Sequence, residues 1–133
     1  PDPLYMPARS RPCILVVDDY ADATEVWALY LRSAGFDVHT AGDGFEAIGY
    51  VRTHLPDLVV LDLNLPGCSG IDVARALQDD AAARHIPLIA MTGSPDRREL
   101  DAARALFRAV VGKPCDPGLL VTTIRELLPP ADG

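Results

Sequence analysis

A short apolar run that ends at a carboxylate is the sequence feature that most constrains the fold. Residues 58–61 read Leu-Val-Val-Leu, Asp62 follows directly, and Pro66 and Gly67 then turn the chain. A continuous Val/Leu run with punctuation on both sides is typical of a strand covered on both faces in a parallel sheet. Open α/β sheets bind ligands outside the carboxyl ends of their strands. Asp62 is therefore a candidate site residue, although a lone aspartate at this place can also be a solvated loop residue.

Four further apolar runs alternate with stretches of helical periodicity. Besides the run before Asp62, the sequence predicts strands at 13–17, 36–40, 86–91 and 109–111. Cap-like residues and Gly or Pro stops predict helices at 22–34, 43–54, 69–77, 94–107 and 116–128. This strict alternation requires a parallel sheet with right-handed crossovers and helices on both faces.

Two of the predicted helices carry specific expectations about their ends and faces. Ser94 and Pro95 are predicted as the N-cap and first residue of the fourth helix, and Asp22 as the cap of the first. The residues of the first helix predicted to face the core, from their spacing, are Ala23, Val26, Leu29, Tyr30 and Ser33.

Length and composition limit the class of protein. The chain has 133 residues, enough for one domain with a genuine core, and no apolar run approaches the roughly 18 residues of a membrane span. We expect a flexible Pro-rich tail at 1–11 without a signal peptide, a domain at 12–129 and a short tail at 130–133. A net charge of −7 gives no electrostatic reason to approach nucleic acid or anionic lipid, so we expect neither direct nucleic-acid binding nor membrane insertion.

Cysteine and histidine usage gives no metal pattern. The three cysteines, Cys13, Cys68 and Cys115, are widely spaced and contain no CxxC pair, which argues against a disulfide framework and a zinc site. Reduced thiols of this kind are typical of a cytoplasmic protein. The three histidines also lack ligand spacing.

Polar side chains follow the predicted strands where the strands end. Asp18 and Asp19 follow the first strand, Asp62 ends the third, Thr92 ends the fourth and Lys113 follows the fifth. The carboxyl ends of parallel strands share one edge, so these groups should converge. Clustered carboxylates repel one another unless a cation lies among them, and Mg²⁺ prefers such oxygen ligands. The sequence thus predicts a magnesium site.

Lys113 is the only lysine among the 12 Lys and Arg residues. In a chain so rich in arginine, this choice indicates a place where a compact ammonium is needed. Together, a carboxylate, Mg²⁺, a hydroxyl and an ammonium suit a phosphoryl group on an aspartate, which Asp62 would acquire by in-line attack.

These motifs resemble those of the receiver domains of two-component response regulators, across residues 12–128. The resemblance rests on Asp18-Asp19, the segment LDLNLPGCSG around Asp62, Thr92-Gly93 and Lys113-Pro114, each at the expected strand end. It implies a flavodoxin-like doubly wound (βα)5 sandwich with strand order 2-1-3-4-5. It also implies a cytoplasmic phospho-acceptor and not a turnover enzyme, with a sensor histidine kinase or histidine phosphotransfer protein as partner.

The resemblance also implies residue roles. Asp62 would be the phospho-acceptor, and Thr92 and Lys113 would hold the phosphoryl group. Mg²⁺ would be bound by Asp19, Asp62 and the backbone carbonyl of Asn64, with Asp18 acting mainly through water. The Lys113–Pro114 peptide bond would be cis.

One position departs from the family pattern. Receiver domains usually carry Tyr or Phe three residues before the lysine, as a switch that follows the threonine, whereas this chain has Val110. A β-branched aliphatic side chain cannot swing as a ring does, so a different route for the signal is expected.

Other functions were weighed against this one. The segment from Gly42 to Ala47 matches GxGxxA, as in a dinucleotide-binding fingerprint, but a dinucleotide site would leave Asp18-Asp19, Thr92 and Lys113 unexplained. A phosphatase with an Asp nucleophile would need a second Asp at Asn64. A phosphorylation-independent pseudo-receiver that only docks partners is the third alternative.

Overall fold

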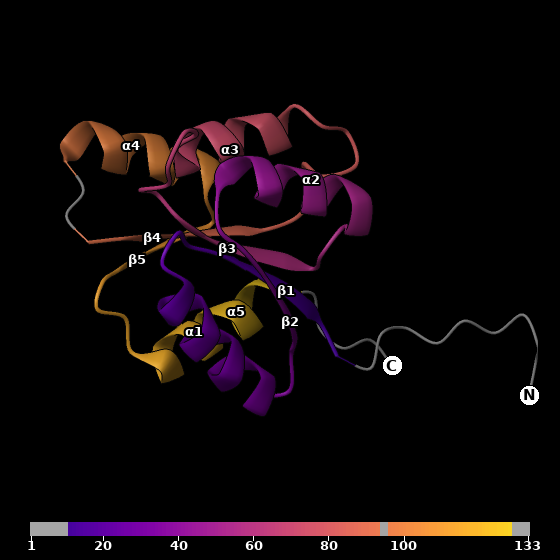
Figure 1. Ribbon diagram of the computed structural model, residues 1–133. Coiled ribbons are helices and arrows are strands. Elements are labelled where there is room, and N and C mark those ends of the chain that lie inside the picture. The colour runs from indigo at the N-terminus through magenta and orange to yellow at the C-terminus, as the bar shows by residue number, and fades with distance from the viewer. Residues whose placement is uncertain (1–10, 94–95, 129–133) are drawn as a thin grey trace, which may run out of the picture.

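The computed structural model describes residues 11–93 and 96–128 and has a five-stranded parallel sheet at its centre (Figure 1). The strand order is β2-β1-β3-β4-β5, as predicted. The strands are β1 (Cys13–Val17), β2 (Asp37–Ala41), β3 (Leu58–Asp62), β4 (Leu88–Thr92) and β5 (Ala109–Gly112). The flavodoxin-like fold class is therefore confirmed.

Five helices connect the strands and cover both faces of the sheet. They are α1 (Ala21–Ser33), α2 (Gly44–His54), α3 (Gly70–Gln78), α4 (Arg97–Leu106) and α5 (Pro117–Leu127). Figure 1 shows α2, α3 and α4 on one face and α1 and α5 on the other. None of these helices, within the described residues, has the length and apolarity needed to cross a membrane.

Each strand supplies side chains to two separate cores because successive residues point to opposite faces. In β1, Leu15 and Val17 pack under α2 and α3, whereas Ile14 and Val16 pack against α1 and α5. All five residues of β1, β3 and β4 are buried. The continuous apolar runs in the sequence reflect this double burial.

Several predicted helix boundaries are confirmed by cap geometry. The Asp43 side chain accepts a hydrogen bond from the Glu46 N–H at 2.8 Å, and the Ser69 hydroxyl accepts one from Asp72 at 3.2 Å. The predicted cap of α4 is wrong. Its N-cap is Asp96, which accepts from the Glu99 N–H, while Ser94 and Pro95 lie outside the described residues.

The predicted core face of α1 is also wrong. The helix begins after Tyr20, which makes no side-chain cap, and its buried residues are Thr24, Ala28 and Leu31. Val26 and Leu29, which were expected inside, are 65% and 68% exposed. Both sets recur at helical spacing, and the set with Thr24, Ala28 and Leu31 is the one that packs on the sheet. The second apolar stripe, with Val26 and Leu29, is left at the surface.

Candidate functional site

The carboxylates of β1 and β3 meet at one edge of the sheet. These strands are neighbours, with Val17 paired to Leu61, so the residues that follow them lie side by side. One carboxylate oxygen from each of Asp18, Asp19 and Asp62 lies within 4.8 Å of the others. Asp18 and Asp62 are buried and Asp19 is exposed. The cluster therefore opens to solvent on the Asp19 side.

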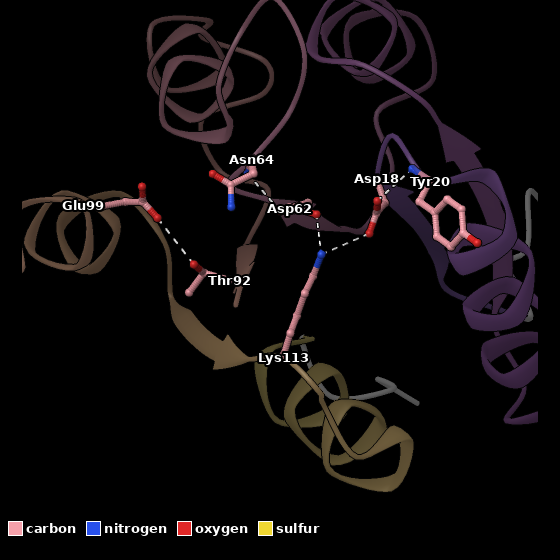
Figure 2. Close-up of polar contacts among 7 residues, drawn as sticks. All are labelled: Asp18, Tyr20, Asp62, Asn64, Thr92, Glu99 and Lys113. Atoms are coloured by element: carbon pink, nitrogen blue, oxygen red, sulfur yellow. Dashed lines mark hydrogen bonds and ion pairs between the residues drawn. The ribbon is translucent and has the colours of Figure 1, made fainter. Parts of the chain in front are cut away.

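Backbone N–H groups fix the two buried carboxylates. The Asn64 N–H donates to Oδ1 of Asp62 at 2.8 Å, and the Tyr20 N–H donates to Oδ1 of Asp18 at 2.9 Å (Figure 2). Each bond spans two residues, as in an Asx-turn, so the turn that leaves each strand also orients its carboxylate. Oδ2 of each carboxylate remains for other partners.

Lys113 brings a cation to these two oxygens. Its Nζ lies 2.5 Å from Oδ2 of Asp62 and 3.4 Å from Oδ2 of Asp18. Burial lowers the pKa of the Lys113 ammonium, but the hydrogen bond and charge of Asp62, and then the charge of Asp18, outweigh burial and raise it. The ammonium is therefore charged at neutral pH. The predicted cis bond between Lys113 and Pro114 is confirmed.

The loop after β3 packs tightly against the candidate acceptor. Gly67 has a φ of +76°, which favours glycine. A Cβ at Gly70 would lie 2.6 Å from the carbonyl oxygen of Asp62 and 2.7 Å from Cα of Leu63. Only glycine allows the start of α3 to approach the end of β3 this closely. The Asp62 backbone is consequently held by the helix that follows it.

Thr92 lies at the same edge but does not point at the cluster. Its hydroxyl donates to Oε1 of Glu99, in the first turn of α4, at 3.4 Å. Figure 2 shows this pair on the side of Asp62 away from Asp18. Sequence reasoning did not select Glu99, because an acidic residue in a first helical turn is ordinary. The role of Thr92 toward a phosphoryl group remains a prediction.

The donor set fits Mg²⁺. Three carboxylates face one ammonium, so the described cluster has an excess of negative charge, and its ligands are hard oxygens. Asp18, Asp19 and Asp62 would hold the ion, and it would neutralise charge on them and on an incoming anion. The Asn64 carbonyl as a further ligand remains a prediction.

An apolar groove lies beside the cluster. It has a volume of about 430 Å³ and runs along α1 and the start of α5. Its lining comprises Tyr20, Asp22, Ala23, Val26, Trp27, Tyr30, Cys115 and Pro117. Tyr20 belongs both to this groove and, through its N–H, to the turn that orients Asp18. Tyr20 thus links the groove to the turn beside the acidic cluster.

The GxGxxA segment, which was weighed as a dinucleotide-binding turn, forms the start of α2. The side chain of Asp43 caps α2, and a Cβ at Gly44 would lie 2.7 Å from Cγ2 of Val73. A pyrophosphate would need the helix N-terminus that Asp43 already occupies. This segment is accordingly a capped, packed turn.

Comparison with protein families gives one match over most of the chain. Residues 14–125 match the model described as the response regulator receiver domain. The DNA-binding response regulator MtrA of Mycolicibacterium paratuberculosis is 40% identical over 121 residues, covering 89% of this chain and 52% of MtrA. Response regulator PleD of Caulobacter vibrioides is 36% identical over 118 residues, covering 86% of this chain and 25% of PleD.

Solved structures show the same fold. A response regulator receiver protein from Pseudomonas putida has a TM-score of 0.83 and 30% identity, with 90% of this chain and 99% of that one covered. The chemotaxis protein CheY4 of Vibrio cholerae has a TM-score of 0.83 and 24% identity, with coverages of 89% and 99%. The chain spans about half the length of MtrA, so its similarity to MtrA covers only that part of the relative.

Proposed function

The chain belongs to the response regulator receiver domain family, a class of signalling domains, and we propose that its Asp62 accepts a phosphoryl group from a phosphohistidine. The donor would be a sensor histidine kinase or a histidine phosphotransfer protein, and the chain would act in the cytoplasm. The observation that carries the proposal is the meeting of Asp62 with Asp18, Asp19 and Lys113 at one sheet edge.

In the proposed reaction, a carboxylate oxygen of Asp62 attacks phosphorus. A P–O bond forms as the P–N bond to the donor histidine breaks, and the imidazole leaves with the electron pair of that bond. The product is an acyl phosphate on Asp62. The Asn64 N–H, held on Oδ1, fixes the carboxylate so that Oδ2 is the oxygen that faces the site.

Lys113 has two roles in this reaction. Before transfer, its ammonium pairs with Oδ2 of Asp62 and offsets part of the repulsion within the cluster. When Oδ2 becomes esterified, the same ammonium can neutralise a phosphoryl oxygen at almost the same place. Bound Mg²⁺ would supply further positive charge for the three carboxylates and the phosphoryl oxygens.

We assign the apolar groove along α1 to the phosphodonor. In-line transfer requires the donor imidazole to sit over Asp62, so the donor protein must cover the adjacent surface. The groove begins at Tyr20, next to the acidic cluster, and is almost wholly apolar in lining. An apolar helix face of the donor fits such a groove. The output of the signal would also be by protein contact.

Labelling with acetyl phosphate tests the acceptor assignment. With Mg²⁺, intact-mass analysis should show one added phosphoryl group that is stable in acid and labile in base. Asp62→Asn should show none. Asp57→Asn, at the other end of β3, serves as the matched control and should be labelled like the wild type. Chelation of Mg²⁺ by EDTA should stop labelling, because the carboxylates and phosphate then repel one another.

Equal labelling of Asp62→Asn would overturn the assignment. Absence of labelling in the wild type, with a purified histidine donor as well as with acetyl phosphate, would favour a docking module that works without phosphorylation.

A second experiment tests the docking groove. Val26→Asp should slow phosphotransfer from a histidine donor about tenfold, because it places a charge in an apolar interface, and should leave labelling by acetyl phosphate unchanged. Leu55→Asp, an exposed apolar residue beyond the end of α2, is the control and should slow neither reaction. Unchanged transfer to Val26→Asp would show that the donor docks elsewhere.

A further inference from the structure

The Thr92 hydroxyl is held by a partner outside the acidic cluster. Thr92 ends β4, is 2% exposed, and donates to Oε1 of Glu99 at 3.4 Å. In Figure 2 the Thr92 side chain is directed toward Glu99, whereas the Asp62 carboxylate faces Lys113. The hydroxyl therefore has a carboxylate acceptor before any phosphoryl group is present.

Glu99 joins this hydroxyl to the beginning of α4. Its backbone N–H is held by the Asp96 side chain at 2.7 Å, as part of the helix cap. Among the described residues, the Glu99 carboxylate accepts its side-chain hydrogen bond from the Thr92 hydroxyl. A movement of the Thr92 hydroxyl therefore affects the first turn of α4 through its hydrogen bond to Glu99.

A hydroxyl has one proton to donate. Thr92 cannot donate it both to Glu99 and to a phosphoryl oxygen on Asp62. The phosphoryl group carries more charge than a carboxylate, and hydrogen bonds to it are short and strong. It therefore competes well for a hydroxyl whose existing bond is 3.4 Å long.

We infer that Glu99 is a positioning residue: it holds the Thr92 hydroxyl in the unphosphorylated state, and transfer of that hydroxyl to the phosphoryl group of Asp62 releases the first turn of α4. This inference rests on the proposed phosphorylation of Asp62. According to this inference, a change in the hydrogen bonding of Thr92 alters the surface of α4 through Glu99.

This route does not need an aromatic residue in β5. Val110 is paired with Ala90 and packs, half-buried, against the core under α2 and α3. It has no polar side-chain atom and cannot exchange hydrogen bonds with Thr92. Glu99 reaches the threonine from α4 directly, so the polar coupling bypasses Val110.

The competition has a measurable effect on ligand affinity. The apparent dissociation constant of a ligand that needs the Thr92 hydroxyl is the intrinsic constant divided by the fraction of molecules in which that hydroxyl is free of Glu99. Removing the Glu99 carboxylate frees the hydroxyl before the ligand arrives. The variant should therefore bind a phosphoryl mimic more tightly than the wild type, although it lacks a native hydrogen bond.

Titration with beryllofluoride in the presence of Mg²⁺, followed by amide chemical shifts, tests this inference. Glu99→Ala should bind about three- to tenfold more tightly than the wild type, the range expected for one hydrogen bond. Glu99→Gln keeps an oxygen acceptor without the charge and should lie between them. Asp101→Asn removes a charge from an exposed position of the same helix and should match the wild type.

The amides of α4 supply a readout that a purely structural role would not change. In ligand-free Glu99→Ala they should already lie part of the way toward their bound positions. In the Thr92→Val background, Glu99→Ala should no longer tighten binding, because the shared hydroxyl is gone.

The outcomes separate this inference from the proposed function. If the wild type binds beryllofluoride and Glu99→Ala binds no more tightly than Asp101→Asn, the role of Glu99 is refuted and phosphorylation at Asp62 stands. If tightening persists in the Thr92→Val background, Glu99 acts by another route and the inference is also refuted. If the wild type does not bind beryllofluoride with Mg²⁺, both proposals fail.

Discussion

Strand β3 has an aspartate at each end, and the two carboxylates have opposite surroundings. Asp57, just before the strand, accepts a hydrogen bond from the Cys13 N–H at 2.7 Å and donates its own N–H to the Cys13 carbonyl. Asp62, the last residue of the strand, lies with two other carboxylates within 4.8 Å. Asp57 pairs with a backbone N–H group, whereas Asp62, besides its own hydrogen bond from the Asn64 N–H, is crowded by like charges.

The difference separates a structural carboxylate from the one that we propose to be the phospho-acceptor. Asp57 gains its partner from folding alone, so this hydrogen bond stabilises the native state. The carboxylates around Asp62 have one ammonium between them and retain excess negative charge. Their native arrangement is fully favourable only with an added cation or with charge removed. Four changes test this contrast.

The largest effect on stability is expected at Asp57, at the amino end of β3. Asp57→Ala should lower the free energy of unfolding by about 2 kcal/mol, because the buried Cys13 N–H loses its acceptor. Urea denaturation measures it, and the stabilisation by Mg²⁺ should be the same as in the wild type. Asp37→Ala, at an exposed position paired with Cys13 across the sheet, should cost little. If Asp57→Ala lost no more unfolding free energy than Asp37→Ala, Asp57 would not be the structural carboxylate described above.

At the carboxyl end of β3, removing a carboxylate should stabilise the protein and not destabilise it. Without Mg²⁺, Asp19→Asn should raise the melting temperature, because it removes one of three clustered charges and no ion pair with Lys113. Mg²⁺ at ten times its dissociation constant should stabilise the wild type by about 1.4 kcal/mol. The variant should lose most of that gain. A full Mg²⁺-dependent shift in Asp19→Asn would place the metal elsewhere.

Lys113 should show a smaller, pH-dependent contribution. Lys113→Gln should cost less than about 1 kcal/mol at neutral pH, since the ammonium is partly solvated. The folded-state pKa of Lys113 lies above its ordinary value of 10.5, so the stabilisation is fully present below pH 10.5 and is lost as the pH rises through the folded pKa. Denaturation of both proteins from neutral to alkaline pH measures this. A difference that first disappears near neutral pH would contradict the prediction.

The smallest effect is expected at Asp80, a second carboxylate held by backbone N–H groups. Hydrogen bonds from Ala82 and Ala83 lower its pKa, with a further contribution from Arg52. This stabilisation is present above the ordinary pKa of 3.8 and disappears as the pH falls through the folded pKa.

Asp80→Asn should therefore lower the melting temperature slightly at neutral pH and not at strongly acidic pH. Asp79→Asn, at the neighbouring exposed position, is the control. A loss that grows in acid would have the wrong sign.

The fold could be predicted in detail because local signals agreed. Apolar runs, caps and stops placed all five strands and the strict alternation, and the family resemblance gave the strand order. The exceptions were the start of α4 and the core face of α1, where periodicity indicated Val26 and Leu29 as core residues. Periodicity identifies an apolar stripe but not what covers it, and α1 carries two stripes.

The candidate site was predictable where chemistry depends on strand ends. Asp18, Asp19, Asp62 and Lys113 converge because parallel strands deliver them to one edge. The direction of the Thr92 hydroxyl was not predictable, because it depends on where α4 begins. The sequence suggested a start at Pro95, whereas the helix begins at Arg97 and places Glu99 in its first turn.

The position of Lys113 has a kinetic consequence. Strands β1 and β3 are central, whereas β5 is a four-residue edge strand with half-exposed side chains. Edge elements open locally far more often than central ones, without global unfolding. If β5 frays at its end, the ammonium leaves while the carboxylates stay in place. The lifetime of an acyl phosphate on Asp62 would then follow the hydrogen-exchange protection of β5 and not the global stability of the domain.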